Sequence, residues 1–139
     1  MLKYSFMTFA CPEYALARVL DAAKRYGYDG VEPRAEEGHL HGVELERTTS
    51  ERQAIRKTFE QAGVAVACLA TSVQLNKSNH DEWRLMVQRT TDFCELAADI
   101  GARRIRVFGG HDPDVSDPAV AAARVREVLF GIAHALERR

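Results

Sequence analysis

The chain has 139 residues, of which 46% are hydrophobic and 28% are charged. This balance is sufficient for a globular domain with a buried core. The 19 basic and 20 acidic residues give a net charge of −1, which does not indicate the basic surface of nucleic-acid-binding or membrane-surface proteins. No apolar run approaches the roughly 20 residues that span a bilayer, and no signal-peptide core follows the N-terminus. We therefore expect a cytoplasmic protein with no nucleic-acid and no membrane partner.

Four units, each a strand followed by a helix, are predicted along the chain. Apolar residues that recur every three or four positions indicate helices, and short apolar runs indicate strands. The strands are expected at 4–10, 29–33, 64–70 and 104–108, and the helices at 13–26, 48–62, 81–100 and 118–136. Thr48 and Glu51 predict a capping box for the second helix, and Asp117 is the expected cap of the fourth. Residues 71–80 are expected to form a polar loop.

A helix, a glycine and a strand recur three times along the chain, at Gly27, Gly63 and Gly101. Glycine is favoured there because it adopts the left-handed conformation that ends a helix. The third strand is apolar throughout, which indicates burial on both faces, as in a parallel sheet covered by helices. Strands that alternate with helices predict an α/β fold with a parallel sheet.

The number of units suggests half of a larger fold. A (β/α)8 or TIM barrel has about 250 residues, so four units make about half of one. We predict that residues 1–139 form a single domain, the N-terminal (β/α)4 half of such a barrel, with strand order 1-2-3-4 and the helices on one outer face. The residues expected in its inner layer are Phe6, Val31, Val66 and Val107. An open flavodoxin-like sheet is the alternative, but it usually has a fifth strand and a phosphate-binding or acidic first loop.

Four segments carry a family resemblance. They are residues 28–34 (YDGVEPR), 38–43 (GHLHGV), 62–69 (AGVAVACL) and 98–110 (ADIGARRIRVFGG). In this order and spacing they resemble strands two to four, and the loop after strand two, of the sugar phosphate isomerase/epimerase family, the xylose isomerase-like TIM barrels. The resemblance covers nearly the whole chain and corresponds to the N-terminal half of the family's barrel.

The resemblance implies a metal-dependent isomerase or epimerase that acts on a small sugar, a sugar phosphate or a keto-acid. In the family, Mg²⁺ or Mn²⁺ is held by glutamate, aspartate and histidine side chains, mainly from strands five to eight, and these would lie beyond Arg139. The metal polarises the oxygens of the substrate, and a pair of glutamates moves the proton. We therefore expect no principal metal ligand in this chain, activity in a full-length protein, and an inactive 139-residue chain on its own.

His41 is the main candidate for a catalytic and substrate-binding residue. It lies in the loop after the second strand, where Glu36, Glu37, His39 and His41 bring carboxylates and imidazoles together. Histidine titrates near neutral pH and can bond sugar hydroxyls or assist ring opening. A solvated loop without a site is the alternative, and metal ligation by both histidines is a third interpretation.

Two further candidates for substrate binding come from the strands. Glu32 ends the second strand and is expected to point toward the mouth of the barrel, as a hydrogen-bond acceptor. Its alternative role is an ion pair with Arg34 or Arg106. Arg106 lies within the fourth strand, where it is either a clamp for phosphate or carboxylate or a member of an interior ion pair.

His111 is the second candidate catalytic residue. It follows Gly109 and Gly110 at the end of the fourth strand, with Asp112 beside it, so the pair could act as acid and base. The alternative is a sharp glycine turn without function.

Two rival functions remain open. The first is an apurinic endonuclease-like phosphodiesterase on the same fold, which would need histidines after strands two and three; residues 70–72 read Ala-Thr-Ser instead. The second is a truncated, non-catalytic half-barrel. The unpaired edges of a half-barrel predict a homo-oligomer or completion by a C-terminal half. The expected small-molecule partner is a sugar or keto-acid substrate.

Overall fold

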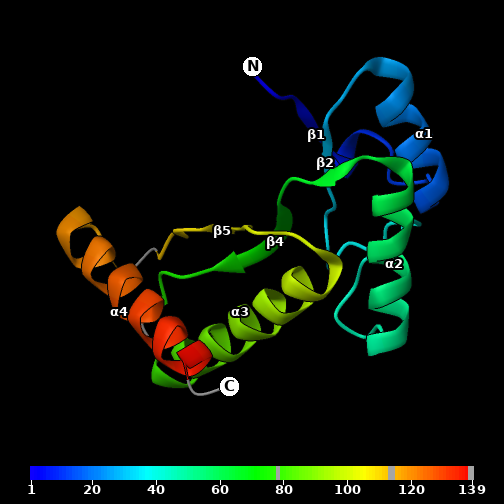
Figure 1. The fold of residues 1–139 in the computed structure, drawn as a ribbon. Helices are drawn as coiled ribbons and strands as arrows, with labels where there is room; N and C mark the ends of the chain where they lie inside the picture. The colour runs from blue at the N-terminus through cyan, green and yellow to red at the C-terminus, as the bar shows by residue number, and fades with distance from the viewer. Residues whose placement is uncertain (78, 113–114, 138–139) are drawn as a thin grey trace. The chain divides into compact units, whose positions relative to one another are not determined.

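The computed structural model describes residues 1–77, 79–112 and 115–137. It is an α/β structure that divides into two compact units, Met1–Thr71 with Phe93–Arg106, and Ser72–Asp92 with Val107–Arg139. Three elements, at residues 69–74, 80–100 and 105–108, contribute residues to both units. In chain order the elements are β1 (Ser5–Met7), a 3-10 helix (Thr8–Ala10), α1 (Leu16–Tyr26), β2 (Gly30–Glu32), α2 (Thr49–Ala62), β3 (Ala65–Val66), β4 (Leu69–Gln74), α3 (His80–Ile100), β5 (Ile105–Phe108) and α4 (Pro118–Glu137) (Figure 1).

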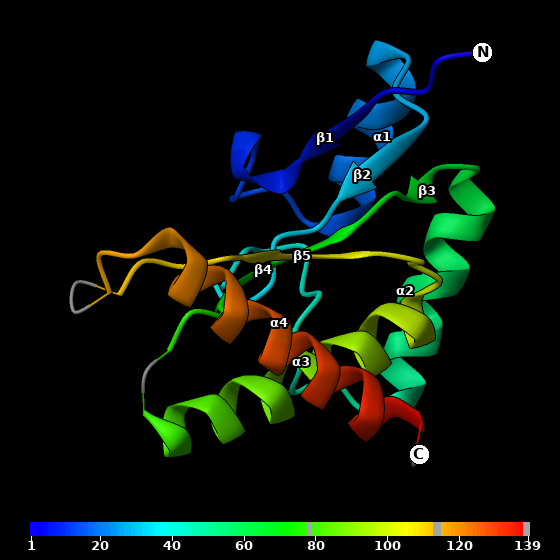
Figure 2. The same ribbon diagram turned by 90° about the vertical axis from the view of Figure 1, so that its left-hand side faces the viewer.

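The strands of the first unit are parallel, as predicted. β1, β2 and β3 lie side by side in that order (Figure 2), with Phe6 opposite Val31 and Val31 opposite Val66. Pro33 follows β2 and has no N–H to donate, so the β2 ladder stops there. Pairing resumes one residue later in an isolated parallel bridge between Arg34 and Ala70.

The third predicted strand is wrong in its extent. Residues 64–70 do not form one strand, because β3 ends at Val66 and β4 begins at Leu69. The polar residues up to Gln74 were expected to be part of a loop, but they continue β4, which pairs with β5. Leu69 N–H donates to the Arg104 carbonyl at the start of this pair.

The helices agree with the predictions except at the start of α1. Thr48 and Glu51 form a complete capping box at α2, and the Asp117 carboxylate accepts the N–H of Ala119 at the start of α4, at 2.8 Å. The first helix begins at Leu16 rather than at residue 13, with Ala15 at its N-cap and no capping side chain. A helix without such a cap depends on packing of its apolar face.

The core of the first unit lies between the sheet and the helices α1 and α2. It consists of Cys11, Val19, Leu20, Ala23, Val31, Phe59 and Val64, with Phe6 and Val66 packed against it. The prediction that Phe6, Val31 and Val66 belong to the inner layer of a barrel is therefore wrong, since their side chains face the helices. Successive residues of a strand point to opposite faces, so Ser5 and Glu32 lie on the other face of the sheet.

The second unit is held by α3 and α4. Val128 and Ile132 of α4 are buried, and Gly131 lets α4 approach the Trp83 ring and Val87 closely. A Cβ at position 131 would lie 2.9 Å from Trp83 Cζ2. None of the helices in the described ranges is long and apolar enough to cross a membrane.

Candidate functional site

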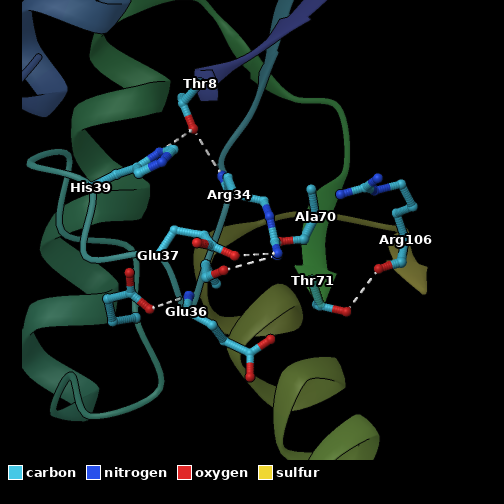
Figure 3. Close-up of polar contacts among 10 residues, drawn as sticks. Thr8, Arg34, Glu36, Glu37, His39, Ala70, Thr71 and Arg106 are labelled. Atoms are coloured by element: carbon cyan, nitrogen blue, oxygen red, sulfur yellow. Dashed lines mark hydrogen bonds and ion pairs between the residues drawn. The ribbon is translucent and has the colours of Figure 1, made fainter. Parts of the chain in front are cut away.

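A buried polar cluster lies where the chain leaves β1 and β2, at the carboxyl ends of these strands. Thr8 follows β1, and Arg34 and His39 follow β2 (Figure 3). His41 lies two residues further along the same loop. Their exposed fractions are 0% for Thr8, 3% for Arg34, 8% for His39 and 4% for His41. Buried polar side chains are stable only when they are hydrogen-bonded, and in this cluster the bonds converge on Thr8.

The Thr8 hydroxyl connects the two loops. Its Oγ1 accepts the backbone N–H of Arg34 at 2.9 Å. The same oxygen lies 3.1 Å from His41 Nε2 and 3.3 Å from His39 Nδ1. The three contacts hold the loop after β2 against the end of β1.

His41 is buried and is bonded at both ring nitrogens. Val43 N–H donates to Nδ1 at 3.1 Å, and Nε2 contacts Thr8. Burial, and to a lesser extent the nearby His39, lower the pKa of His41 from its ordinary value of 6.5 to about 4, while a backbone hydrogen bond with Arg34 opposes this shift. His41 is therefore a neutral imidazole near neutral pH.

Arg34 carries a buried positive charge at the same edge. Its guanidinium donates to the carbonyl oxygens of Ala35 and Ala70, at 2.9 and 3.3 Å, and forms an ion pair with Glu37 at 2.7 Å. The Arg34 side chain is 4% exposed, whereas that of Glu37 is 40% exposed. The ion pair thus lies at the surface of the cluster and fixes the loop that carries both histidines.

Glu44 closes this loop from its far end. Its Oε2 accepts the backbone N–H of Glu36 at 2.7 Å. Burial raises the pKa of the Glu44 carboxyl, and the backbone hydrogen bonds from Glu36 and Gly38 oppose that rise. Glu36 adopts a left-handed conformation with a φ of 72°, which is unfavourable for a residue other than glycine.

Glu32 and Arg106, the two candidates from the strands, are both half-buried. Glu32 accepts a hydrogen bond from the Ser5 hydroxyl at 2.6 Å, on the sheet face opposite the core. Arg34 pairs with Glu37 rather than with Glu32. The carbonyl of Arg106 accepts the hydroxyl proton of Thr71 (Figure 3).

His111 lies in the second unit and is exposed. The Asp112 beside it is 8% exposed and forms an ion pair with Arg124 at 2.9 Å. Asp112 is thus engaged with Arg124, and the use of His111 and Asp112 as acid and base stays a prediction. We predict that His111 opens to the same edge as His41 and Glu32, the carboxyl ends of the strands.

The described residues hold no group of three or more histidine, cysteine, aspartate or glutamate side chains that could bind a metal ion. What the cluster itself offers is a set of N–H and O–H groups in a nearly dry setting, which suits hydrogen bonding to uncharged oxygens.

Residues 20–139 match the model of the xylose isomerase-like TIM barrel. The chain belongs to this family. The α/β fold with parallel strands is therefore that of the xylose isomerase-like barrels, as the motifs in the sequence indicated.

Solved structures of this fold have different activities. The chain is similar to D-psicose 3-epimerase crystallised with D-fructose (TM-score 0.76, 15% identity, 99% of this chain and 49% of that chain). It is also similar to the probable 3-DHS dehydratase AsbF from Bacillus anthracis (TM-score 0.71, 16% identity, 96% of this chain and 49% of that chain). A third similar structure is 3-keto-D-glucoside 4-epimerase from E. coli (TM-score 0.69, 13% identity, 99% of this chain and 53% of that chain). The chain thus spans about half the length of these xylose isomerase-like structures. No match to a curated protein is found.

Sequence reasoning missed Thr8 and the function of Arg34 in the cluster. A threonine in an aromatic and apolar segment gives no signal of its own, because its hydroxyl contacts residues that are 26 to 33 positions away. Arg34 was considered only as a partner of Glu32. The sequence did indicate the loop itself, through its concentration of histidines and glutamates.

Proposed function

We propose that this chain supplies the N-terminal part of the substrate pocket of an isomerase or epimerase that acts on a small sugar, a sugar phosphate or a keto-acid. The observation that carries the proposal is the buried Thr8–His39–His41 cluster at the carboxyl ends of β1 and β2. In TIM-barrel enzymes the active site is built at this end of the strands. Membership of the xylose isomerase-like family supports the reaction class.

The cluster fits a polyhydroxylated substrate. Buried neutral donors bind hydroxyl and carbonyl oxygens, and these hydrogen bonds gain strength because the surroundings are of low dielectric. His41 can contact such a ligand where a substrate oxygen replaces Thr8 as the acceptor of its Nε2–H. We assign Glu32 and Arg106 to substrate binding and His111 to acid–base chemistry within the same proposal.

The proton shift itself needs more than the hydrogen bonds of the Thr8–His39–His41 cluster. Isomerisation or epimerisation moves a proton on a carbon next to a carbonyl, and it requires a base and stabilisation of the resulting oxyanion. We propose that a divalent metal provides the stabilisation and that its ligands come from outside this part of the chain. Removal of activity by EDTA and its recovery with Mn²⁺ or Mg²⁺ test this element.

The reaction class is tested by deuterium exchange. A protein that contains this chain is incubated in D₂O with a panel of neutral ketoses, their phosphates and small keto-acids. An isomerase or epimerase that exchanges its catalytic proton with solvent incorporates deuterium next to the carbonyl, and NMR detects both the exchange and the new sugar. Loss of water from the substrate, or cleavage of DNA at abasic sites, without such exchange would contradict the proposal.

Variants connect the activity to the cluster. His41→Gln should lower kcat/KM about tenfold or more, comparable to the loss of one hydrogen bond to substrate. His134→Gln is the matched control, because His134 lies on α4 with its side chain 65% exposed. Equal activity of both variants would remove His41 from the site.

A further inference from the structure

The bonds around Thr8 determine where the protons of the cluster lie. A backbone N–H can only donate, so the bond from Val43 makes His41 Nδ1 an acceptor. A neutral imidazole has one N–H, and in His41 it must therefore be on Nε2, which lies 3.1 Å from Thr8 Oγ1; the ring also has a backbone hydrogen bond with Arg34. Burial keeps this imidazole neutral at neutral pH, with a pKa of about 4.

The state of His39 follows from the state of Thr8. The Thr8 oxygen has two lone pairs and one hydrogen. When the Arg34 N–H and the His41 Nε2–H both donate to this oxygen, the hydroxyl hydrogen is left for His39 Nδ1 at 3.3 Å. With Nδ1 as an acceptor, neutral His39 carries its own proton on Nε2.

The second nitrogen of His39 is not used within the described chain. Nε2 has no hydrogen-bond partner among the described residues, and it is not one of their fully buried, unsatisfied atoms. The Phe9 ring lies beside the imidazole, edge to face, with centroids 5.5 Å apart, and is 54% exposed. An N–H donor next to an exposed aromatic face suits a sugar, which presents both oxygens and C–H groups.

We infer that His39 is a substrate-contacting residue whose Nε2–H donates to an uncharged hydroxyl or carbonyl oxygen of the ligand, and that Thr8 is the positioning residue that fixes this tautomer. The assignment of the ligand rests on the proposed function. Before a ligand binds, His39 and His41 thus have different tasks: His41 holds Thr8, and Thr8 orients His39. Because Nε2 already carries the proton, neutral His39 acts as a donor and not as a base.

The tautomers are tested first, without any substrate. Long-range ¹H–¹⁵N NMR spectra of histidine-labelled protein near pH 7.5 distinguish the two nitrogens of each ring. We expect the Nε2–H form for both His39 and His41. Thr8→Val removes the hydroxyl and should shift the His39 signals toward a mixture of tautomers, whereas Thr8→Ser should preserve them. An Nδ1–H form of His39 in the unmodified protein would overturn the inference.

Ligand contact is tested by titration with D-fructose, a neutral ketose, in the same NMR experiment. We expect the His39 Nε2 and its proton to shift on binding, with His134 as the unaffected reference. His39→Ala should weaken binding about three- to tenfold, and His39→Gln, which retains an N–H donor, should recover part of the loss. Since binding is read directly, the test does not need turnover: an unmoved His39 signal in a protein that does epimerise sugars overturns this inference alone. Shifts in His39 without any turnover, in a full-length protein that contains this chain, leave the contact standing and contradict the proposed reaction.

Discussion

His39 and His41 are two positions apart in the sequence, yet the chain gives them different surroundings. Both ring nitrogens of His41 are bonded within the protein, and burial keeps it uncharged near neutral pH. His39 shares only its Nδ1 with Thr8. At the scale of the residue, it is the backbone N–H of Val43 that separates the two roles, because it determines which nitrogen of His41 holds the proton.

Lowering the pH from 6.5 to 4 should destabilise the protein through His41. The pKa of His41 is about 4 in the folded chain against an ordinary 6.5, so in this range the unfolded chain binds a proton that the folded chain does not. Stability rises with pH wherever the unfolded state binds more protons. The free energy of unfolding should thus fall by about 2 kcal/mol, after allowance for partial solvent screening, with the contribution fully present above pH 6.5. Urea denaturation at a series of pH values measures it.

Two variants show whether His41 or another titrating group causes this pH dependence of stability. His41→Gln removes the titrating ring but keeps an N–H for Thr8, and it should lose this part of the pH dependence. His134→Gln, on the exposed face of α4, should keep it. If both variants retain the full slope between pH 4 and 6.5, another group is responsible.

At the scale of the element, single residues determine where strands and helices stop or meet. Pro33 interrupts the ladder after β2, and pairing resumes only at Arg34, opposite Ala70 in β4. In the second unit, Gly131 determines how closely α4 packs against α3. Glycine is unfavourable inside a helix, by about 1 kcal/mol relative to alanine, so its presence in α4 needs a reason in the packing against α3.

Gly131→Ala should therefore destabilise the protein, although alanine is the better helix former. The new Cβ would lie 2.9 Å from Trp83 Cζ2 and 3.1 Å from Val87 Cγ2, and overpacking of this kind costs about 1–3 kcal/mol. After the gain in helix propensity, we expect a net loss of about 1 kcal/mol or more in chemical denaturation. In a protein that already carries Trp83→Phe, the smaller ring leaves more room for the new Cβ. Gly131→Ala should therefore cost less stability in that protein than in the unmodified one. A stabilised Gly131→Ala protein would show that α3 and α4 do not approach as described.

At the scale of the whole molecule, the sheet of the first unit has a strand edge without a partner in the described part of the chain. β1 pairs with β2 on one side only. The apolar residues Phe6, Val31 and Val66 are covered by the helices, while the other face carries the Ser5–Glu32 hydrogen bond. Association through this unit would thus be driven by strand pairing more than by an apolar patch.

The 139-residue chain, expressed alone, should therefore self-associate, because an open strand edge pairs with another chain. Sedimentation velocity at tens of micromolar, roughly the range where such edges associate, should show dimers or larger species. Addition of a separately produced second (β/α)4 half should convert these to a one-to-one complex. A stable monomer at these concentrations, indifferent to such a partner, would contradict the half-barrel interpretation.

The sequence by itself determined the class of the fold and the order of its elements. Helical periodicity, the Thr48–Glu51 capping box and the glycines after three helices are local signals, and local interactions produce what they predict. The family motifs at 28–34 and 98–110 added the barrel type, which the family match confirms. The same local signals located the loop with both histidines.

Only the tertiary structure decided which face of a strand is buried and which atoms of the loop meet. A run of apolar residues has no alternation to reveal its core side, so Phe6, Val31 and Val66 could not be assigned to the helix face in advance. The Thr8 hydroxyl reaches residues 26 to 33 positions away. Its geometry is set by the parallel pairing of β1 with β2, and such long-range contacts leave no mark in the composition or spacing of the segments that make them.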